Sequence, residues 1–245
     1  ARERAGRGSS AMDSWLGRVL PGGYRLEALL ESGASSRTYR ATQHGERGGR
    51  LSRVKVLLNP ALRDAEARRR FRDWARAASQ IQHPHILGVY GFGRTEDGTC
   101  FLTTELVEGV TLRRLLDGDQ RGAATLLPPR RALGIFLQIV AGLAAAHAQG
   151  LAHGDLRMES VLLSEARSSA QGALDEARVC DFGCAALALQ PDDGEPLLRK
   201  DVAALGRILY ELCCGQAPIQ GPRWRVPLPL ASLAPGRRFS PALES

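Results

Sequence analysis

The chain has 245 residues, of which 44% are apolar, so it is long enough to bury a large core in one two-lobed domain or in two small ones. Its formal net charge of +7 would ordinarily favour nucleic acid or an acidic lipid surface as a partner. Nearly all of the 33 basic residues are scattered arginines, however, with one dense group on an expected helix (Arg68, Arg69, Arg70, Arg72 and Arg76). We therefore interpret the charge as a solvated surface, and we expect this segment to bind neither nucleic acid nor membrane.

The apolar runs and the cysteines indicate the cellular compartment in which we expect the protein. The longest apolar run, at 133–146, is shorter than a membrane span and contains Gln138. The five cysteines have no paired spacing, which argues against a disulfide framework and favours small core residues in a reducing compartment. A cytoplasmic location is the resulting expectation. The chain starts with Ala1 rather than methionine, so the sequence leaves open whether a sensor or transmembrane segment lies beyond either end.

The first half of the chain predicts a leader followed by a mainly β unit. Residues 1–14 are rich in Arg, Gly and Ser and are expected to form a disordered leader or linker. A hairpin is expected over 26–41, with its turn at Gly33. Residues 65–81 have the periodicity of an amphipathic helix, with apolar side chains recurring on one face (Phe71, Trp74, Ala78 and Ile81). Two further strands are expected at 86–92 and 100–107.

The second half predicts helices around a polar motif. Residues 108–112 open a helix, and a long apolar helix is expected over 128–149, ending at Gly150. The chain then runs through His153-Gly154-Asp155 into an apolar strand, Val161-Leu162-Leu163, and on to Asp181-Phe182-Gly183. Each triplet alone often occurs by chance in unrelated sequences. The two triplets in this order and at this spacing are a much more specific signal.

This order of motifs resembles the catalytic loop and the metal-binding triplet of the protein kinases, in particular the bacterial serine/threonine kinases. Residues 15–26 resemble the entry to that domain, and 201–212 resemble its F helix, with Asp201 as the anchoring aspartate. The resemblance implies an α+β, two-lobed fold with a cleft between the lobes. It predicts a small β-rich N-terminal lobe with the C helix at about 15–105, and a larger helical C-terminal lobe at about 106–245 that stops before its last helices.

The resemblance also implies roles for individual residues, because phosphoryl transfer depends mainly on positioning and charge. Asp155 corresponds to the carboxylate that accepts the proton of the attacking hydroxyl, Arg157 to the lysine of the catalytic loop, and Lys55 to the phosphate-binding lysine. Asp181 and Ser160 correspond to the two Mg²⁺ ligands. The remaining implied positions surround ATP (Gly33 in the phosphate loop, Thr104 as gatekeeper, Glu105 and Val107 in the hinge, and Leu162 below the adenine).

Several positions depart from the family pattern. In the phosphate loop, Glu31 stands at the first glycine and Ser36 at the third, and a carboxylate beside phosphates has the wrong sign. Arg53 stands where a small apolar residue would roof the adenine. The glutamate of the C helix, about nine residues before the His-Pro motif, falls on Trp74, and a serine hydroxyl at 160 is a poor substitute for an amide ligand.

The segment after the triplet departs most. Only 17 residues separate Gly183 from Asp201, without an Ala-Pro-Glu motif, so there is no evident platform for a peptide substrate. Residues 190–194 are typical of a polar turn, and the chain beyond 216–219 is rich in proline.

Three hypotheses follow. The first is a pseudokinase, a regulatory or protein-binding module in which binding of ATP and Mg²⁺ is weak or absent and Lys55 pairs with Asp181. The second is a low-rate serine/threonine kinase that uses ATP and Mg²⁺, because Lys55, Asp155 and Asp181 are all present. A protein partner or protein substrate is expected in either case, and no oligomeric state is indicated. A third hypothesis, a basic nucleic-acid or membrane-surface binder, depends on charge alone.

Overall fold

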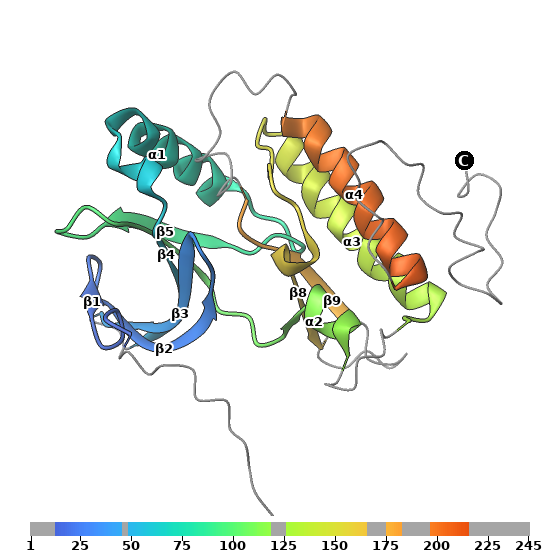
Figure 1. The fold of residues 1–245 in the computed structure, drawn as a ribbon, viewed down its shortest axis with the longest axis horizontal. Helices are drawn as coiled ribbons and strands as arrows, with labels where there is room; N and C mark the ends of the chain where they lie inside the picture. The colour runs from blue at the N-terminus through green and yellow to red at the C-terminus, as the bar shows by residue number, and fades with distance from the viewer. Residues whose placement is uncertain (1–12, 46–48, 119–125, 166–174, 183–196, 216–245) are drawn as a thin grey trace, which may run out of the picture. The chain divides into compact units, whose positions relative to one another are not determined.

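The computed structural model of the chain describes residues 13–45, 49–118, 126–165, 175–182 and 197–215 (Figure 1). The chain divides into two compact units, one formed by 1–75 with 89–106 and the other by 76–88 with 107–245. The described part of the first unit is a curved sheet with one long helix, and that of the second is mainly helical with a small sheet (Figure 1). The predicted α+β fold class is confirmed.

The first unit is organised by a six-stranded antiparallel sheet in the order β1-β2-β3-β4-β6-β5. Its strands are β1 (Val19–Leu20), β2 (Tyr24–Ser32), β3 (Ser36–Gln43), β4 (Arg50–Leu57), β5 (Val89–Arg94) and β6 (Cys100–Glu105). The hairpin predicted over 26–41 is confirmed as β2 and β3. The strand predicted to start at 86 starts at Val89, because Ile86 forms a bridge with Val179 of the second unit's sheet instead.

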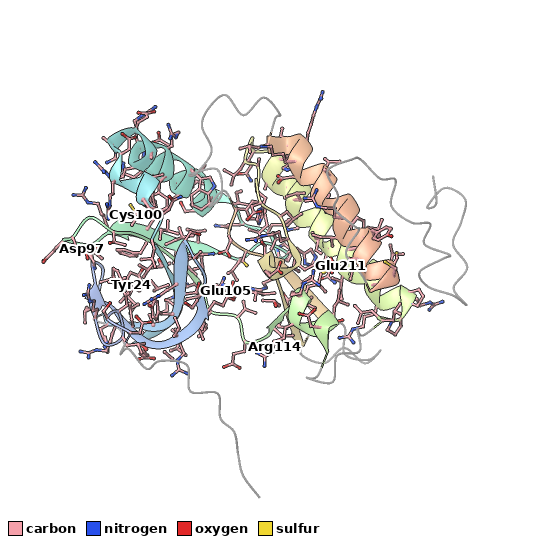
Figure 2. All side chains as sticks on the ribbon, viewed as in Figure 1. Tyr24, Asp97, Cys100, Glu105, Arg114 and Glu211 are labelled. Carbon is pink, nitrogen blue, oxygen red and sulfur yellow. The ribbon has the colours of Figure 1, made fainter. Side chains whose placement is uncertain are left out.

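The core of the first unit lies on one face of this sheet. Residues alternate between faces along a strand, and the inward set includes Leu26, Tyr39, Val54 and Val56, all at most 1% exposed. Tyr24 lies with them, its ring edge-on to Phe101 at 6.5 Å between centroids (Figure 2). Each such buried side chain contributes about 1.5–3 kcal/mol.

Asp13 fastens the start of the described chain to this sheet. Its carboxylate accepts hydrogen bonds from the Tyr39 hydroxyl (2.8 Å), the Arg37 guanidinium (2.9 Å) and the Trp15 amide (3.1 Å). Burial, together with the bond to Asp13, raises the pKa of Tyr39 to about 12. Asp13 falls within the leader predicted from the sequence; residues 1–12 of that leader lie outside the described residues.

The predicted amphipathic helix is confirmed as α1 (Ala65–Gln80), which follows a short 3₁₀ helix, η1 (Pro60–Arg63). Asp64 begins it by accepting the Ala67 amide at 2.8 Å. Phe71 is buried and lies edge-on to Phe92 of β5 at 6.1 Å.

One arginine of α1 forms ion pairs with acidic residues on the solvated side of the helix, where the sequence predicted the arginines. Arg69 pairs with Glu66 at 2.6 Å and with Asp73 at 3.4 Å, and all three side chains are more than half exposed. Part of the helix's positive charge is therefore neutralised on its own surface.

The second unit contains three helices and a three-stranded sheet in its described parts. The helices are α2 (Leu112–Asp117), α3 (Pro129–His147) and α4 (Leu197–Cys214), with a 3₁₀ turn, η2 (Met158–Ser160). The sheet has the order β7-β8-β9, from β7 (Val110–Thr111), β8 (Val161–Glu165) and β9 (Asp175–Val179). The helices α3 and α4 run side by side (Figure 1). The predicted end at Gly150 is confirmed, since Gly150 has a φ of +73° just beyond α3.

Gln138 joins α3 to β9. Its side-chain amide donates to the Asp175 carbonyl at 3.0 Å, and its carbonyl accepts the Ala177 amide at 2.8 Å. Arg131, two turns earlier, binds the Asp175 carboxylate with two hydrogen bonds of 2.6 and 2.8 Å. None of the helices in the described parts of the chain has both the length and the apolar content needed to cross a bilayer.

The cysteines are mostly core residues, as predicted. Cys100, Cys180 and Cys214 are buried, and Cys213 is half-buried. Burial raises the pKa of the Cys100 thiol, which keeps it protonated and unreactive. Cys184, the polar turn expected at 190–194 and the proline-rich segment beyond 216 lie outside the described residues.

Candidate phosphotransfer site

The loop after α3 is held by one buried carboxylate, that of Asp201 on α4. Asp201 is 0% exposed and accepts the His153 amide at 2.7 Å and the Gly154 amide at 2.8 Å. His147, in the last turn of α3, places its Nε2 atom 2.8 Å from the same carboxylate. The predicted anchoring role of Asp201 is confirmed, and these contacts fix the backbone immediately before Asp155.

His153 is a structural residue. Its Nε2 atom lies 2.9 Å from the Cys180 carbonyl, and its ring packs against Phe182 with 4.9 Å between centroids. Burial lowers the pKa of His153, so the ring is neutral at pH 7. This packing connects the catalytic-loop motif to the Asp181-Phe182 pair within the second unit.

Asp155 is presented to solvent at the end of this anchored loop. Its side chain is 46% exposed, and one carboxylate oxygen lies 2.9 Å from Nη2 of Arg157. The residue before it, Gly154, has a φ of +82°, a conformation that side chains other than glycine rarely adopt. Asp155 and Arg157, two predicted catalytic residues, are thus brought together; their catalytic role stays a prediction.

Ser160 is buried behind the loop rather than presented with Asp155. Its hydroxyl donates to the Asp155 carbonyl at 3.5 Å, and its own carbonyl accepts the Cys180 amide at 2.8 Å. The carboxylate of Asp181 and this hydroxyl, turned toward a backbone carbonyl, make a poorer donor set for Mg²⁺ than a carboxylate and an amide. Among the described residues, no group of three or more His, Cys, Asp or Glu side chains could hold a metal ion. The role of Ser160 as a metal ligand stays a prediction.

Asp181 has an unusual backbone conformation. Its φ is +65°, and it is the one residue other than glycine with a positive φ in the part of the chain that the structure describes. Aspartate tolerates this left-handed region better than most residues. Phe182 beside it is buried, and Gly183 lies outside the described residues. The role of Asp181 as a metal ligand stays a prediction.

Two of the predicted ATP contacts meet in a small apolar cluster of the second unit. Leu162 of β8 is 7% exposed and packs with Leu87 and Cys180, and Val107 packs against this cluster. Leu162 is expected below the adenine and Val107 in the hinge, and the structure brings these two residues together. Their contact with ATP stays a prediction.

Lys55 is half-buried on β4 of the first unit, opposite Thr38 on β3 and Leu102 on β6. Its pairing with Asp181 stays a prediction, because the two residues belong to different units.

The other predicted ATP contacts of the first unit lie on β6 and in the β2–β3 turn. Thr104, the expected gatekeeper, is buried, and its hydroxyl donates to the Glu105 carbonyl at 3.3 Å. Glu105 ends β6. The Gly33 amide closes the predicted phosphate loop by donating to the Ser36 carbonyl at 2.9 Å. Contact of these residues with nucleotide stays a prediction.

The helix α1 carries an indole at the position where the family has the glutamate that orients the lysine. Trp74 stands there, half-buried, with its ring 6.1 Å from that of Phe71. The acidic residues of α1 are Glu66 and Asp73, and both pair with Arg69 on the exposed side of the helix. The carboxylates of α1 are therefore engaged on its surface, away from the position of that glutamate.

Two departures that the sequence shows separately form one contact. Arg53 of β4 and Glu31 of β2 make an ion pair with 2.7 Å between Nη2 and Oε2. The Arg53 side chain is 6% exposed and that of Glu31 is 43% exposed. Arg53 is also the one buried arginine among the described residues.

A second charged cluster, which the sequence did not predict, joins three elements of the second unit. Arg113 of α2 lies 2.5 Å from the carboxylate of Glu211 on α4 and 3.4 Å from that of Glu159 in η2. Glu211, labelled in Figure 2, is 8% exposed. The available signal was a glutamate on the same face of the expected helix at 201–212 as Asp201, Ala204 and Ile208.

Comparisons with known proteins agree with this fold. The family model for the protein kinase domain matches residues 24–196. Serine/threonine-protein kinase pkn3 of Myxococcus xanthus is 29% identical over 95% of this chain and 46% of its own length. PknL of Mycobacterium tuberculosis is 33% identical over 83% of this chain and 52% of its own length. The chain thus spans about half the length of these curated relatives.

Solved structures give the same result. A double mutant of the Mycobacterium tuberculosis PknI kinase domain superposes with a TM-score of 0.71 and 26% identity, covering 89% of this chain and 83% of that one. The fold and the anchored loop define a protein-kinase-like domain. The chain belongs to the protein kinase family, and its relatives are bacterial serine/threonine kinases.

Proposed function

We propose that this chain is a catalytically impaired member of the family, a pseudokinase domain of the cytoplasm that regulates or binds another protein. The observation that carries this proposal is the state of α1. Trp74 stands where the family has a glutamate, while Glu66 and Asp73 pair with Arg69 on the helix surface. Orientation of charged groups is the main contribution of a kinase site, so replacing this glutamate with an indole removes one of its orienting groups.

The predicted Mg²⁺ ligands of the second unit support the same conclusion. Ser160 supplies a hydroxyl that is turned toward the Asp155 carbonyl, where the family has an amide ligand. Loss of one transition-state contact typically costs on the order of 3 kcal/mol, or about a hundredfold in rate. Several such losses do not simply add. Together they are expected to reduce a turnover of about 1–100 per second to a trace.

A slow serine/threonine kinase is the second candidate, and one specific observation favours it. Asp155 is exposed, lies next to Arg157 and follows a backbone that Asp201 anchors, which is the arrangement a proton-accepting carboxylate needs. Such an enzyme would use ATP with Mg²⁺ and transfer phosphate to a protein substrate.

A phosphotransfer assay separates the two candidates. The wild type and Asp155→Ala would be incubated with radiolabelled ATP and Mg²⁺, with and without a generic protein substrate. We expect equal, background incorporation for both proteins. Incorporation by the wild type that disappears in Asp155→Ala would refute the proposal and establish the slow kinase.

Nucleotide binding gives an independent measurement. A ligand stabilises the folded state by RT ln(1 + [L]/Kd), so ATP at about 1 mM with a Kd above about 1 mM adds at most about 0.4 kcal/mol. For a chain of this size that corresponds to a melting shift of about 1–2 °C. We expect such a small shift, with little dependence on Mg²⁺. A Kd near about 10 μM would instead give about 2.7 kcal/mol, a shift of several degrees that contradicts the expectation.

A further inference from the structure

The ion pair between Glu31 and Arg53 lies on the same face of the sheet as Lys55. Glu31 is opposite Thr38 in the β2–β3 register, and Thr38 is opposite Lys55 in the β3–β4 register. Residues directly opposed in antiparallel strands project to the same face, so these three residues form one row. Arg53 is two residues before Lys55 on β4 and therefore shares that face.

The pair bridges an entire strand. The strand β3 lies between β2 and β4, and neighbouring strands are about 4.8 Å apart, so the two backbones that carry the pair are separated by roughly 10 Å. The side chains of Arg53 and Glu31 must extend toward each other across β3 to make a contact of 2.7 Å. Thr38, on the strand beneath, is 1% exposed. The two side chains of the pair therefore meet over the strand between them, on the face that carries Lys55.

The charge of Glu31 and the bulk of Arg53 disfavour the binding of a nucleotide beside Lys55. A buried guanidinium requires a partner, and Glu31 supplies it. Phosphates approaching Lys55 would meet the carboxylate of Glu31, and a base would have to displace the Arg53 side chain. The Gly33 amide, one of the donors that a phosphate would use, already donates to the Ser36 carbonyl within the turn.

These observations point to an autoinhibitory contact: the Glu31–Arg53 pair occupies the nucleotide-facing surface of the first unit and excludes nucleotide from it. The inference rests on the proposed function and deepens it, because it assigns poor nucleotide binding to one removable contact. Loss of the helix glutamate and of the metal ligand then limits phosphate transfer separately from binding.

The test is to remove the pair and measure nucleotide affinity. The variant Glu31→Gly/Arg53→Ala would be compared with the wild type by calorimetric titration with ATP, with and without Mg²⁺. The matched control is Glu66→Ala/Arg69→Ala, which removes an exposed ion pair of 2.6 Å from α1 and leaves the same net charge. We expect affinity for ATP to increase at least about tenfold in the first variant and to stay unchanged in the control.

Each outcome decides the matter. A folded Glu31→Gly/Arg53→Ala variant with wild-type affinity overturns the inference, as does micromolar ATP binding by the wild type. If that variant does not fold, Glu31→Gln, which removes the charge but keeps the side chain's size, is expected to tighten binding at least about threefold, and unchanged affinity overturns the inference. The proposed function has a separate readout: it fails only if the wild type transfers phosphate in a manner that depends on Asp155.

Discussion

Replacing Asp201 by alanine should unfold the loop that carries Asp155. The change removes the acceptor of two buried backbone amides, those of His153 and Gly154, and a contact with His147. A hydrogen bond to a charged group contributes about 1.5–3 kcal/mol, and an orphaned buried donor costs about 1–3 kcal/mol. Because these terms share one carboxylate and do not add, we expect a total of about 3–5 kcal/mol.

Such a loss is a large fraction of the stability of about 5–15 kcal/mol that is typical of a domain. At about 2–4 °C per kcal/mol, the melting temperature of Asp201→Ala should fall by about 6–20 °C. The control is Asp155→Ala, whose exposed pair with Arg157 contributes at most about 1 kcal/mol, so its melting temperature should change by less than about 4 °C.

Thermal unfolding followed by circular dichroism measures both variants under the same conditions. Binding to a protein partner should survive Asp155→Ala and be lost in Asp201→Ala, because the proposed role depends on the fold and not on the proton acceptor. The reasoning is refuted if Asp201→Ala melts within about 2 °C of the wild type, a shift worth no more than about 1 kcal/mol, which would mean that water or another group replaces the carboxylate.

Two further predictions concern buried ionisable side chains. The pKa of His153 is lowered by burial, so below its unfolded value of about 6.5 the unfolded chain binds a proton that the folded chain does not, and stability falls as the pH falls, by at most about 1.4 kcal/mol per pH unit. Denaturant unfolding between about pH 7.5 and 5, which spans that unfolded value, should show a shallower slope in His153→Gln, and an equal slope would contradict this. Arg113→Met leaves the Glu211 carboxylate buried without this ion pair and should lower the free energy of unfolding by about 1–3 kcal/mol in the same assay. The control, Arg131→Met at a more exposed pair, should lower it by less than about 1 kcal/mol. Equal losses of stability would argue against a structural role of Arg113.

The sequence predicted individual elements well where the signal was local. The turn at Gly33, the apolar periodicity of α1 and the glycine at 150 each act within a few residues, and the structure places a hairpin, a helix and a helix end there. The start of β5 was missed because Ile86 is apolar in either setting. It bridges to Val179, which is far away in the sequence.

Contacts between distant side chains could not be predicted in the same way. Glu31 and Arg53 were identified as two separate departures, because their pairing depends on the register of three strands and on two β-bulge irregularities in the β2–β3 pair. The Arg113 cluster depends on how α2, η2 and α4 pack. The anchor at Asp201 was predicted only through resemblance to a family, since nothing local in the sequence connects it to His153.

The departures from the family pattern are distributed unevenly between the two units, and under the proposed function this sets the order in which substitutions should restore binding and transfer. In the second unit the anchored loop, the exposed Asp155 and the His153–Phe182 packing are all present, and Ser160 is the main departure among the described residues. In the first unit the Glu31–Arg53 pair lies on the Lys55 face, and Trp74 stands at the expected position of the helix glutamate. Removing the pair alone should therefore raise the affinity for ATP without giving transfer, because Trp74 still occupies the expected position of the orienting glutamate. Under the proposed function, transfer should require a carboxylate at that position of α1 and an amide at position 160 as well, and we therefore expect substitutions to separate nucleotide binding from catalysis.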